Sequence, residues 1–135
     1  MGGVNIEYQS LKMEVITQAV TGKLAELAAL GQTGVRLENP DARTSYPCCV
    51  VHPPQAKPLY GAAMWELSIS VELWAARPYE ALRLLDEVQS KLQALNLVLS
   101  SNTPLVRDEV SGLWRLGGQF EVRWNAITNY FQKSR

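Results

Sequence analysis

The amino-acid sequence predicts an α+β fold, a two-layer sandwich in which two α-helices pack against a mixed or antiparallel β-sheet. Two segments, 5–30 and 78–95, carry apolar residues at the three- and four-residue spacing of amphipathic helices. A third segment, 65–73, alternates apolar and polar residues without error, as a half-buried strand does. Because turn-forming residues separate the other apolar runs, the expected order of elements is α-β-β-α-β-β.

The first helix is expected to span residues 5–30. Asn5 suits the N-cap and Gly31 suits the end of the helix. Gly22 costs the helix interior about 1 kcal/mol relative to alanine, which allows a bend, but we adopt one continuous helix. The apolar stripe consists of Tyr8, Leu11, Val15, Ala19, Val20, Leu24 and Leu27.

Loops and two short strands are expected before the clearest strand. Residues 31–47 are rich in turn formers, with one short strand at 35–37, and residues 48–51 indicate a second. Residues 53–60 contain three prolines, which lack the backbone donor that a strand ladder needs. We therefore expect 53–60 to be an exposed connection.

The strand at 65–73 is the strongest signal in the chain. Its five apolar side chains form one face, whose burial would contribute on the order of 10 kcal/mol. The opposite face consists of Glu66, Ser68, Ser70 and Glu72, and these side chains must meet water or a polar partner. The polar side of the sheet is therefore the first candidate for a partner interface.

The second half of the chain predicts a helix followed by a hairpin. Pro78 suits the first helical position, and the apolar stripe runs through Leu82, Leu85, Val88, Leu92 and Leu95. Strands are expected at 104–108 and 112–124, joined by a turn at 110–112, with Gly117 and Gly118 marking a bulge or bend. Residues 129–135 show no strong period, so we expect a partner to order them.

Length and composition indicate one domain over residues 1–135. With 47% hydrophobic residues and 19% charged residues, a single core can outweigh chain entropy. Thirteen basic residues balance thirteen acidic ones, so the chain lacks the positive field typical of nucleic-acid binders. No apolar run approaches the roughly 20 residues that span a bilayer, and the first residues do not resemble a secretory signal. We expect no membrane partner and synthesis in the cytoplasm.

Covalent chemistry has few candidate residues. Cys48 and Cys49 are adjacent, so on a strand they point to opposite faces and should remain reduced thiols. His52 is the only histidine, and two thiols with one imidazole fall short of the four ligands of a zinc site. Cys48 and His52 would share a strand face but lie too far apart for a hydrogen bond. We expect no catalytic, metal or cofactor-binding residue, and no enzymatic activity.

The tryptophans divide into two pairs. Trp65 and Trp124 fall on the apolar sides of alternating strands, which favours core packing over base stacking. Trp74 and Trp114 lie near strand ends, where an interface and the core are equally consistent. The residues expected at a partner interface are Pro53, Pro54, Lys57, Pro58, Tyr60, Glu66, Ser68, Ser70, Glu72, Trp74 and Trp114.

Five short motifs stand out along the chain: MWELSISVELW at 64–74, PYEA at 78–81, LDEV at 85–88, WR at 114–115 and FEVRW at 120–124. With these motifs the chain resembles the tail terminator or tail-completion (head-tail joining) proteins of tailed bacteriophages. In that family a long N-terminal helix, a sheet crossed by a second helix and a C-terminal strand pair form the subunit. Six subunits close into a ring on the last ring of the tail tube.

The resemblance implies a virion structural protein that stops tail polymerisation and provides a docking surface for the head connector. Its implied partners are other copies of itself in a homo-hexamer, the tail tube protein and a head-completion or neck protein. A sheath protein would join them if the tail is contractile. DNA would meet the ring only in transit through its lumen, at the tail end of the virion. The family supplies no catalytic residues and no cofactor.

Three alternatives remain open from the sequence. The chain could be another phage neck or tail-tube ring protein, because similar subunits form those rings. It could be a small cytosolic module that holds an apolar ligand or a peptide between sheet and helices. An enzyme that uses Cys48, Cys49 or His52 is motivated only by the closeness of these residues in the sequence.

Overall fold

Two long antiparallel strands, β4 (Met64–Ala75) and β7 (Trp114–Asn125), form the centre of the sheet. Each has 12 residues, and they pair without a register shift from Met64 opposite Asn125 to Ala75 opposite Trp114. The computed structural model describes residues 11–59 and 63–132. Since side chains alternate along a strand, this unbroken ladder assigns every residue of both strands to one of two faces.

Shorter strands extend the sheet on both sides of this pair. Along β4 lie β2 (Cys48–Val51) and β3 (Gln55–Pro58), and along β7 lie β5 (Val98–Asn102), β6 (Val106–Arg107) and β8 (Tyr130–Gln132). The strand β1 (Val35–Arg36) pairs with β2 in parallel, whereas the other pairs are antiparallel. The sheet is therefore mixed, with the order β1-β2-β4-β7-β5 along its main path.

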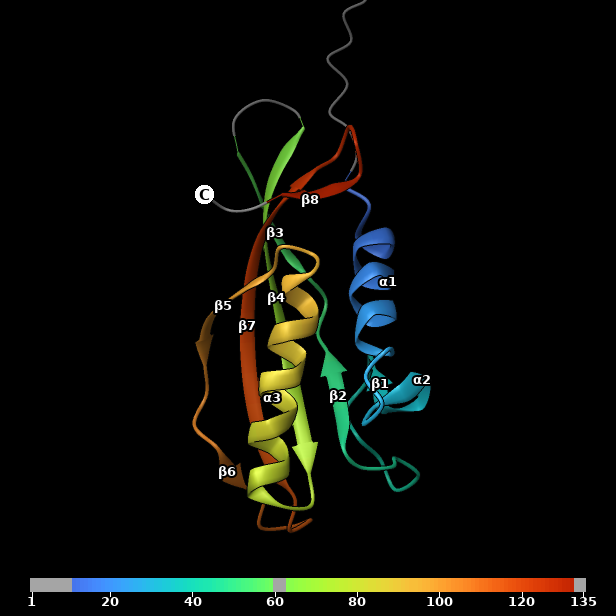
Figure 1. Ribbon diagram of the computed structural model, residues 1–135, viewed down its shortest axis with the longest axis vertical. Coiled ribbons are helices and arrows are strands. Elements are labelled where there is room, and N and C mark those ends of the chain that lie inside the picture. Colours follow the sequence, from blue (N-terminus) through green and yellow to red (C-terminus); the bar gives the residue numbers. More distant parts are fainter. Residues whose placement is uncertain (1–10, 60–62, 133–135) are drawn as a thin grey trace, which may run out of the picture.

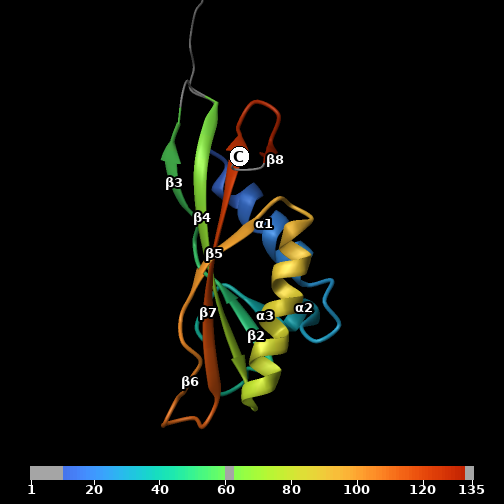
Figure 2. The ribbon, with the colours of Figure 1, turned by 60° about the vertical axis from the view of Figure 1, so that its left-hand side comes forward.

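The helices lie on one side of the sheet (Figures 1 and 2). The helix α3 (Pro78–Gln93) runs over β4 and β7, while α1 (Met13–Leu24) and the short α2 (Gly31–Gly34) lie toward the β1–β2 edge. The predicted α+β sandwich is confirmed, although the chain contains more elements than the expected order.

The core forms between the helices and the helix-facing residues of the central strands. The predicted stripe is confirmed at Leu85, Val88 and Leu92, but Leu82 is 41% exposed and Leu84 is buried in its place. Trp124 is 1% exposed, and Trp65 packs against the core while half-buried, as expected for both. The fully buried helix-facing residues include Ile16, Val20, Leu24, Leu67, Ile69, Leu73, Val88, Leu92, Phe120 and Val122.

The first helix is shorter than predicted. It begins at Met13, after the non-helical Leu11 and Lys12, and ends at Leu24, while Asn5 lies outside the described residues. Beyond Leu24 the chain forms successive turns, in which Leu27 and Leu30 each donate to the carbonyl three residues earlier. These turns keep leucines at a spacing of three, which imitates a helix in the sequence. Gly31 has φ +61, a conformation that favours glycine.

The strands differ from the expected ones in three places. Residues 55–58 form β3 rather than a loop, because a strand at the sheet edge tolerates proline. The strand β5 was not expected, and neither was β8, where Phe131 packs edge-on against Trp124 with ring centroids 4.8 Å apart. The side chain of Asn96 donates to the Phe131 carbonyl at 2.9 Å, which fixes β8 to the end of α3.

Gly117 and Gly118 do not form the predicted bulge. The β4–β7 register is continuous across both, and the irregularity lies in β5, between Leu99 and Ser101. A Cβ atom at Gly118 would stand 3.2 Å from Leu85 and 3.3 Å from Leu99. Gly118 therefore serves close packing of α3 and β5 on the sheet rather than a bend.

We predict opposite effects for two glycine substitutions. Gly118→Val should lower the free energy of unfolding by about 1–3 kcal/mol, because its methyl groups overfill a packed site. The matched variant Gly22→Ala should raise it by about 0.5–1 kcal/mol, since nothing lies within 4 Å of a Cβ there and alanine favours helix. Equilibrium urea unfolding measures both. A Gly118→Val protein as stable as the parent would contradict the packing described here.

Candidate assembly surfaces

The candidate nucleophiles lie in β2 and directly after it. Cys48 and His52 occupy the same side of the sheet, because their partners in β4 are Trp74 and Ser70, but they stand about 13 Å apart along the strand. Both thiols are fully buried and free. Burial raises the pKa of Cys48 to about 11 and also raises the pKa of Cys49. Such thiols disfavour the thiolate form that nucleophilic attack requires.

The carboxylates of the described chain also lack a common centre. Within residues 11–59 and 63–132 no three His, Cys, Asp or Glu side chains converge as metal ligands would. Asp108 accepts hydrogen bonds from the Ser111 hydroxyl at 2.6 Å and the Ser111 amide at 3.1 Å, which lower its pKa. This carboxylate therefore stabilises the β6–β7 turn. None of the helices in the described part is long and apolar enough to span a membrane.

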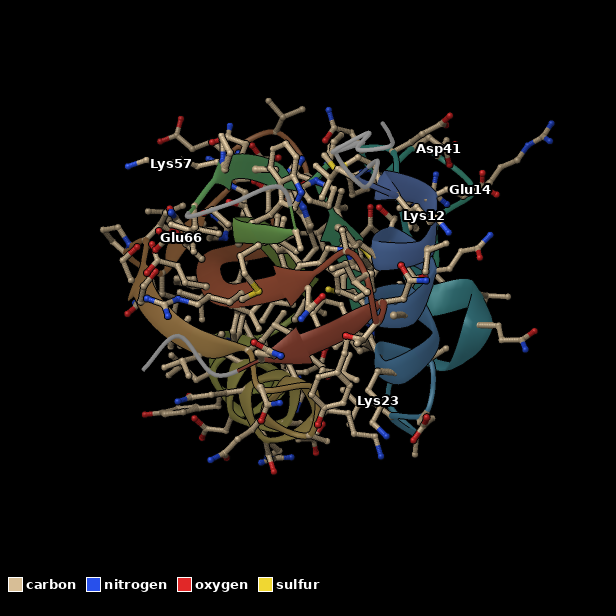
Figure 3. All side chains as sticks on the ribbon, turned by 90° about the horizontal axis from the view of Figure 1, so that it is seen from above. Lys12, Glu14, Lys23, Asp41, Lys57 and Glu66 are labelled. Carbon is tan, nitrogen blue, oxygen red and sulfur yellow. The ribbon has the colours of Figure 1, made fainter. Side chains whose placement is uncertain are left out.

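The face of the sheet opposite the helices, here called the open face, is polar. On β4 it presents Glu66, Ser68, Ser70, Glu72 and Trp74, all half-buried, as the sequence predicts for the first four. The facing residues of β7 are Arg115, Gly117, Gln119, Glu121 and Arg123. Viewed from above, Lys57 of β3 and Glu66 lie on the side of the sheet away from α3 (Figure 3).

Hydrogen bonds hold the open-face side chains in place. The Gln119 amide donates to the Ser68 hydroxyl at 2.7 Å, across the β4–β7 pair. The indole of Trp74 donates to the Glu72 carboxylate at 2.8 Å, and the Arg115 guanidinium lies 5.4 Å from the Trp74 ring centroid. A cation over an indole and a carboxylate on its N–H fix the ring from two directions. Trp74 is thus a preorganised aromatic group on a polar surface.

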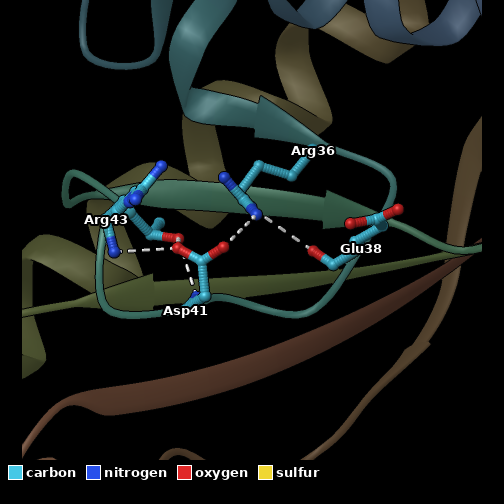
Figure 4. Close-up of polar contacts among 5 residues, drawn as sticks. Arg36, Glu38, Asp41 and Arg43 are labelled. Atoms are coloured by element: carbon cyan, nitrogen blue, oxygen red, sulfur yellow. Dashed lines mark hydrogen bonds and ion pairs between the residues drawn. The ribbon is translucent and has the colours of Figure 1, made fainter.

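The loop between β1 and β2 covers one border of the open face. Arg36 contacts the Asp41 carboxylate at 3.5 Å and the Glu38 carbonyl at 3.4 Å, and Asp41 accepts the Arg43 amide at 2.8 Å (Figure 4). The hydrogen bond from the Arg43 amide is the largest cause of a lowered pKa at Asp41. Asn39, Pro40 and Tyr46 of this loop line a hollow of about 430 Å³ together with Glu72 and Trp74. Cys48 and Val50, on the open side of the neighbouring strand β2, are buried as well.

The predicted interface residues do not form one surface. Pro53, Lys57 and Pro58 are exposed along the β3 edge, Pro54 is buried, and Tyr60 lies outside the described residues. Trp114 pairs with Ala75 and therefore faces the helix side, opposite to Trp74. Trp74 and Trp114 thus lie on opposite sides of the sheet, because they differ in strand parity.

A second surface, which the sequence did not indicate, is a groove beside α1. It has a volume of about 480 Å³ and is lined mainly by apolar and uncharged groups, with Glu14 as its charged residue. We call it the α1 groove; its lining residues are Met13, Glu14, Thr17, Gln18, Thr21, Leu37, Val51, Pro53 and Pro54. It exists because α1 lies beside β1 and the end of β2, a placement that no local motif encodes.

The open-face residues of β7 were not among the predicted interface residues, although the sequence contains the pattern that places them there. Glu121 and Arg123 alternate with apolar residues in the same way as Glu66 and Ser68, and pairing the two strands would have joined them on one face. Gln55 pairs with Ser68 and therefore also lies on the open face, but it could not have been found in this way, because its segment was interpreted as a loop. The α1 groove carried no signal in the sequence.

Comparisons with known proteins find a similar fold but no matching family. No family model matches the sequence, and no curated protein matches it. A chain in the solved structure described as "Virion of native gene transfer agent (GTA) particle" is similar, with a TM-score of 0.60 and 20% sequence identity. The match covers 84% of this chain and 98% of that chain. At this identity the two chains share a fold.

We predict that neither cysteine is reactive in the folded protein. A thiol with a pKa of about 11 has roughly one thiolate per thousand molecules at about pH 8, and burial also blocks access. A disulfide reagent such as DTNB should label no thiol before unfolding and both thiols in denaturant. The denatured sample is the control. Fast labelling of one thiol in the native protein would revive the enzyme hypothesis.

Proposed function

We propose that this chain is a structural protein of a phage-like virion, that it forms part of a ring at the tail end, and that it performs no covalent chemistry. The observation that carries the proposal is the fold shared with a chain of a gene transfer agent virion, at a TM-score of 0.60 over 98% of that chain. Because nearly the whole of that chain is matched, the similarity concerns a complete subunit fold rather than a common substructure.

The surfaces support an assembly role. The open face presents a preorganised tryptophan and hydrogen-bonded polar side chains without a reactive centre in the described residues. Interfaces between subunits combine such aromatic anchors with polar surroundings. The raised pKa values of the two buried thiols argue against the enzyme hypothesis. These features fit a protein whose work is contact with other proteins.

Within the virion, the proposed position is the end of the tail tube. Six copies would close into a ring that stops tail polymerisation and docks the head-completion or neck protein, with a sheath protein as a further partner in a contractile tail. Closing a ring places sheet edges against neighbours, which removes the hazard of uncontrolled strand pairing. The zero net charge suits a lumen through which DNA must pass without being trapped.

A ligand- or peptide-binding module is the second candidate function. The α1 groove favours it, because about 480 Å³ lies within the range of small-molecule sites and much of its lining is apolar. Saturable binding of an apolar fluorescent probe to a strictly monomeric protein would support this candidate. Loss of that binding in a Val51→Asp variant that remains folded would locate it in the groove.

We predict a defect in tail morphology when virions assemble without this protein. Electron micrographs should show overlong or headless tails, since nothing would stop tube polymerisation or join the head. Supplying the parent chain from a plasmid should restore the morphology, and this is the control. A second plasmid should carry Ser68→Arg, which places a bulky charge on the open face and should restore it poorly. Normal virions in the absence of the protein would refute the proposed function.

A further inference from the structure

Three segments that lie far apart in the sequence meet at one hollow on the open face. The β1–β2 loop contributes residues up to Tyr46, the end of β4 contributes Trp74, and the β6–β7 turn contributes Asp108. The hollow has a volume of about 430 Å³, and we call it the Trp74 hollow. It lies on the side of the sheet opposite α1 and α3, so the described helices leave it accessible to a partner (Figure 2).

The groups in the Trp74 hollow are held in place before any partner binds. The Trp74 indole donates to Oε1 of Glu72 at 2.8 Å, and the Arg115 guanidinium lies 5.4 Å from the Trp74 ring centroid. Oδ2 of Asp108 accepts the Ser111 hydroxyl at 2.6 Å. Preorganised groups lose little conformational freedom on binding, so more of the contact energy remains as affinity.

The residue types of the hollow are those that dominate binding at protein interfaces. Tryptophan, tyrosine and arginine are enriched among hot-spot residues, and the hollow contains one of each, Trp74, Tyr46 and Arg115. Tyr46 is 36% exposed and Trp74 is half-buried, so both rings offer surface to a partner. We therefore expect the occupant of the hollow to be a side chain of another protein.

The charges in the hollow favour a basic side chain. Two carboxylates, Glu72 and Asp108, accompany one guanidinium, Arg115, so the lining carries one excess negative charge. Hydrogen bonds from Ser111 lower the pKa of Asp108, which keeps this carboxyl group ionised at neutral pH. Neither carboxylate forms an ion pair within 4 Å in the described part of the chain.

Each carboxylate also keeps one oxygen for a partner. The contacts within the described chain use Oε1 of Glu72 and Oδ2 of Asp108, which leaves Oε2 and Oδ1 for further hydrogen bonds. A guanidinium has a planar face that stacks on aromatic rings and N–H groups that donate to carboxylates. An acidic side chain would instead meet two like charges, which disfavours it.

We propose that the Trp74 hollow binds an arginine or lysine side chain of a neighbouring virion protein. The cation lies beside the rings of Trp74 and Tyr46 and donates hydrogen bonds to the two carboxylates, Glu72 and Asp108. This inference rests on the proposed function, to which it adds a docking surface and the chemistry of the partner that the surface recognises.

The first experiment titrates the full chain, labelled with nitrogen-15 in its tryptophans, with N-acetyl-arginine amide as the probe. The indole N–H resonance of Trp74, identified by its loss in Trp74→Phe, should shift saturably. N-acetyl-citrulline amide has nearly the same shape without the charge and should bind at least about threefold more weakly, and N-acetyl-glutamate amide should not bind. Equal binding of citrulline and arginine overturns the inference, as does preferential binding of glutamate or the absence of any shift.

Variants that remove a charge locate the binding. Glu72→Gln and Asp108→Asn each remove one charge but keep an oxygen that can accept the hydrogen bond present in the parent chain. Each should weaken arginine binding about threefold or more. The matched control Glu121→Gln removes a charge on the same face outside the hollow and should leave binding unchanged. Thermal unfolding verifies that the variants are folded. Equal weakening by all three substitutions would indicate a general charge effect and would overturn the site.

The outcome is separable from that of the proposed function. The double variant with Glu72→Gln and Asp108→Asn should restore tail morphology poorly in virions that lack the parent protein, whereas Glu121→Gln should restore it. Full restoration by the double variant would refute the docking role of the hollow while leaving the tail function intact. Normal virions without the protein would instead remove the proposed function, and the titration would still decide whether the hollow binds a cation.

Discussion

The antiparallel ladder between β4 and β7 is the constraint on which the rest of the structure depends. Because its 12 residue pairs run without a register shift, each side chain of both strands is committed to one side of the sheet. The apolar set, such as Leu67, Ile69 and Phe120, then requires a cover, which α3 and α1 provide. A slip by one residue would exchange the core and the open face, so the pattern of burial makes the register strongly specified.

Burial on one side leaves the other side free for recognition. The open face is held by hydrogen bonds among its own side chains, as at Trp74 and Gln119, and needs no helix to cover it. Cys48 and Val50 are buried although they lie on the open side, and the β1–β2 loop at this border is fixed by the ion pair of Arg36 and Asp41. The same arrangement that buries the thiols raises their pKa values, because burial disfavours the charged thiolate.

Fold similarity and surface chemistry contribute different parts of the functional conclusion. The similarity to a chain of a virion covers 84% of this chain and concerns the fold, and at 20% identity it does not transfer residue roles. Residue roles must therefore be inferred from the surfaces of this chain. Among these surfaces, the edges of the sheet differ in what protects them from pairing with another strand. Proline and lysine protect β3, a helix lies beside β1 and β2, and a bulge interrupts β5.

The sequence alone determined the fold class, the strand at 65–73, the helix from Pro78 and the polar side of the sheet, because alternation and helical spacing are local patterns that burial enforces. It could not determine where the first helix stops, since turns that place Leu24, Leu27 and Leu30 three residues apart imitate a helix. It also could not identify β3, β5 or β8, which are strands only because a long neighbour offers an edge. The tertiary structure decided the α1 groove and the separation of Trp74 from Trp114, because both depend on pairing and packing between distant segments.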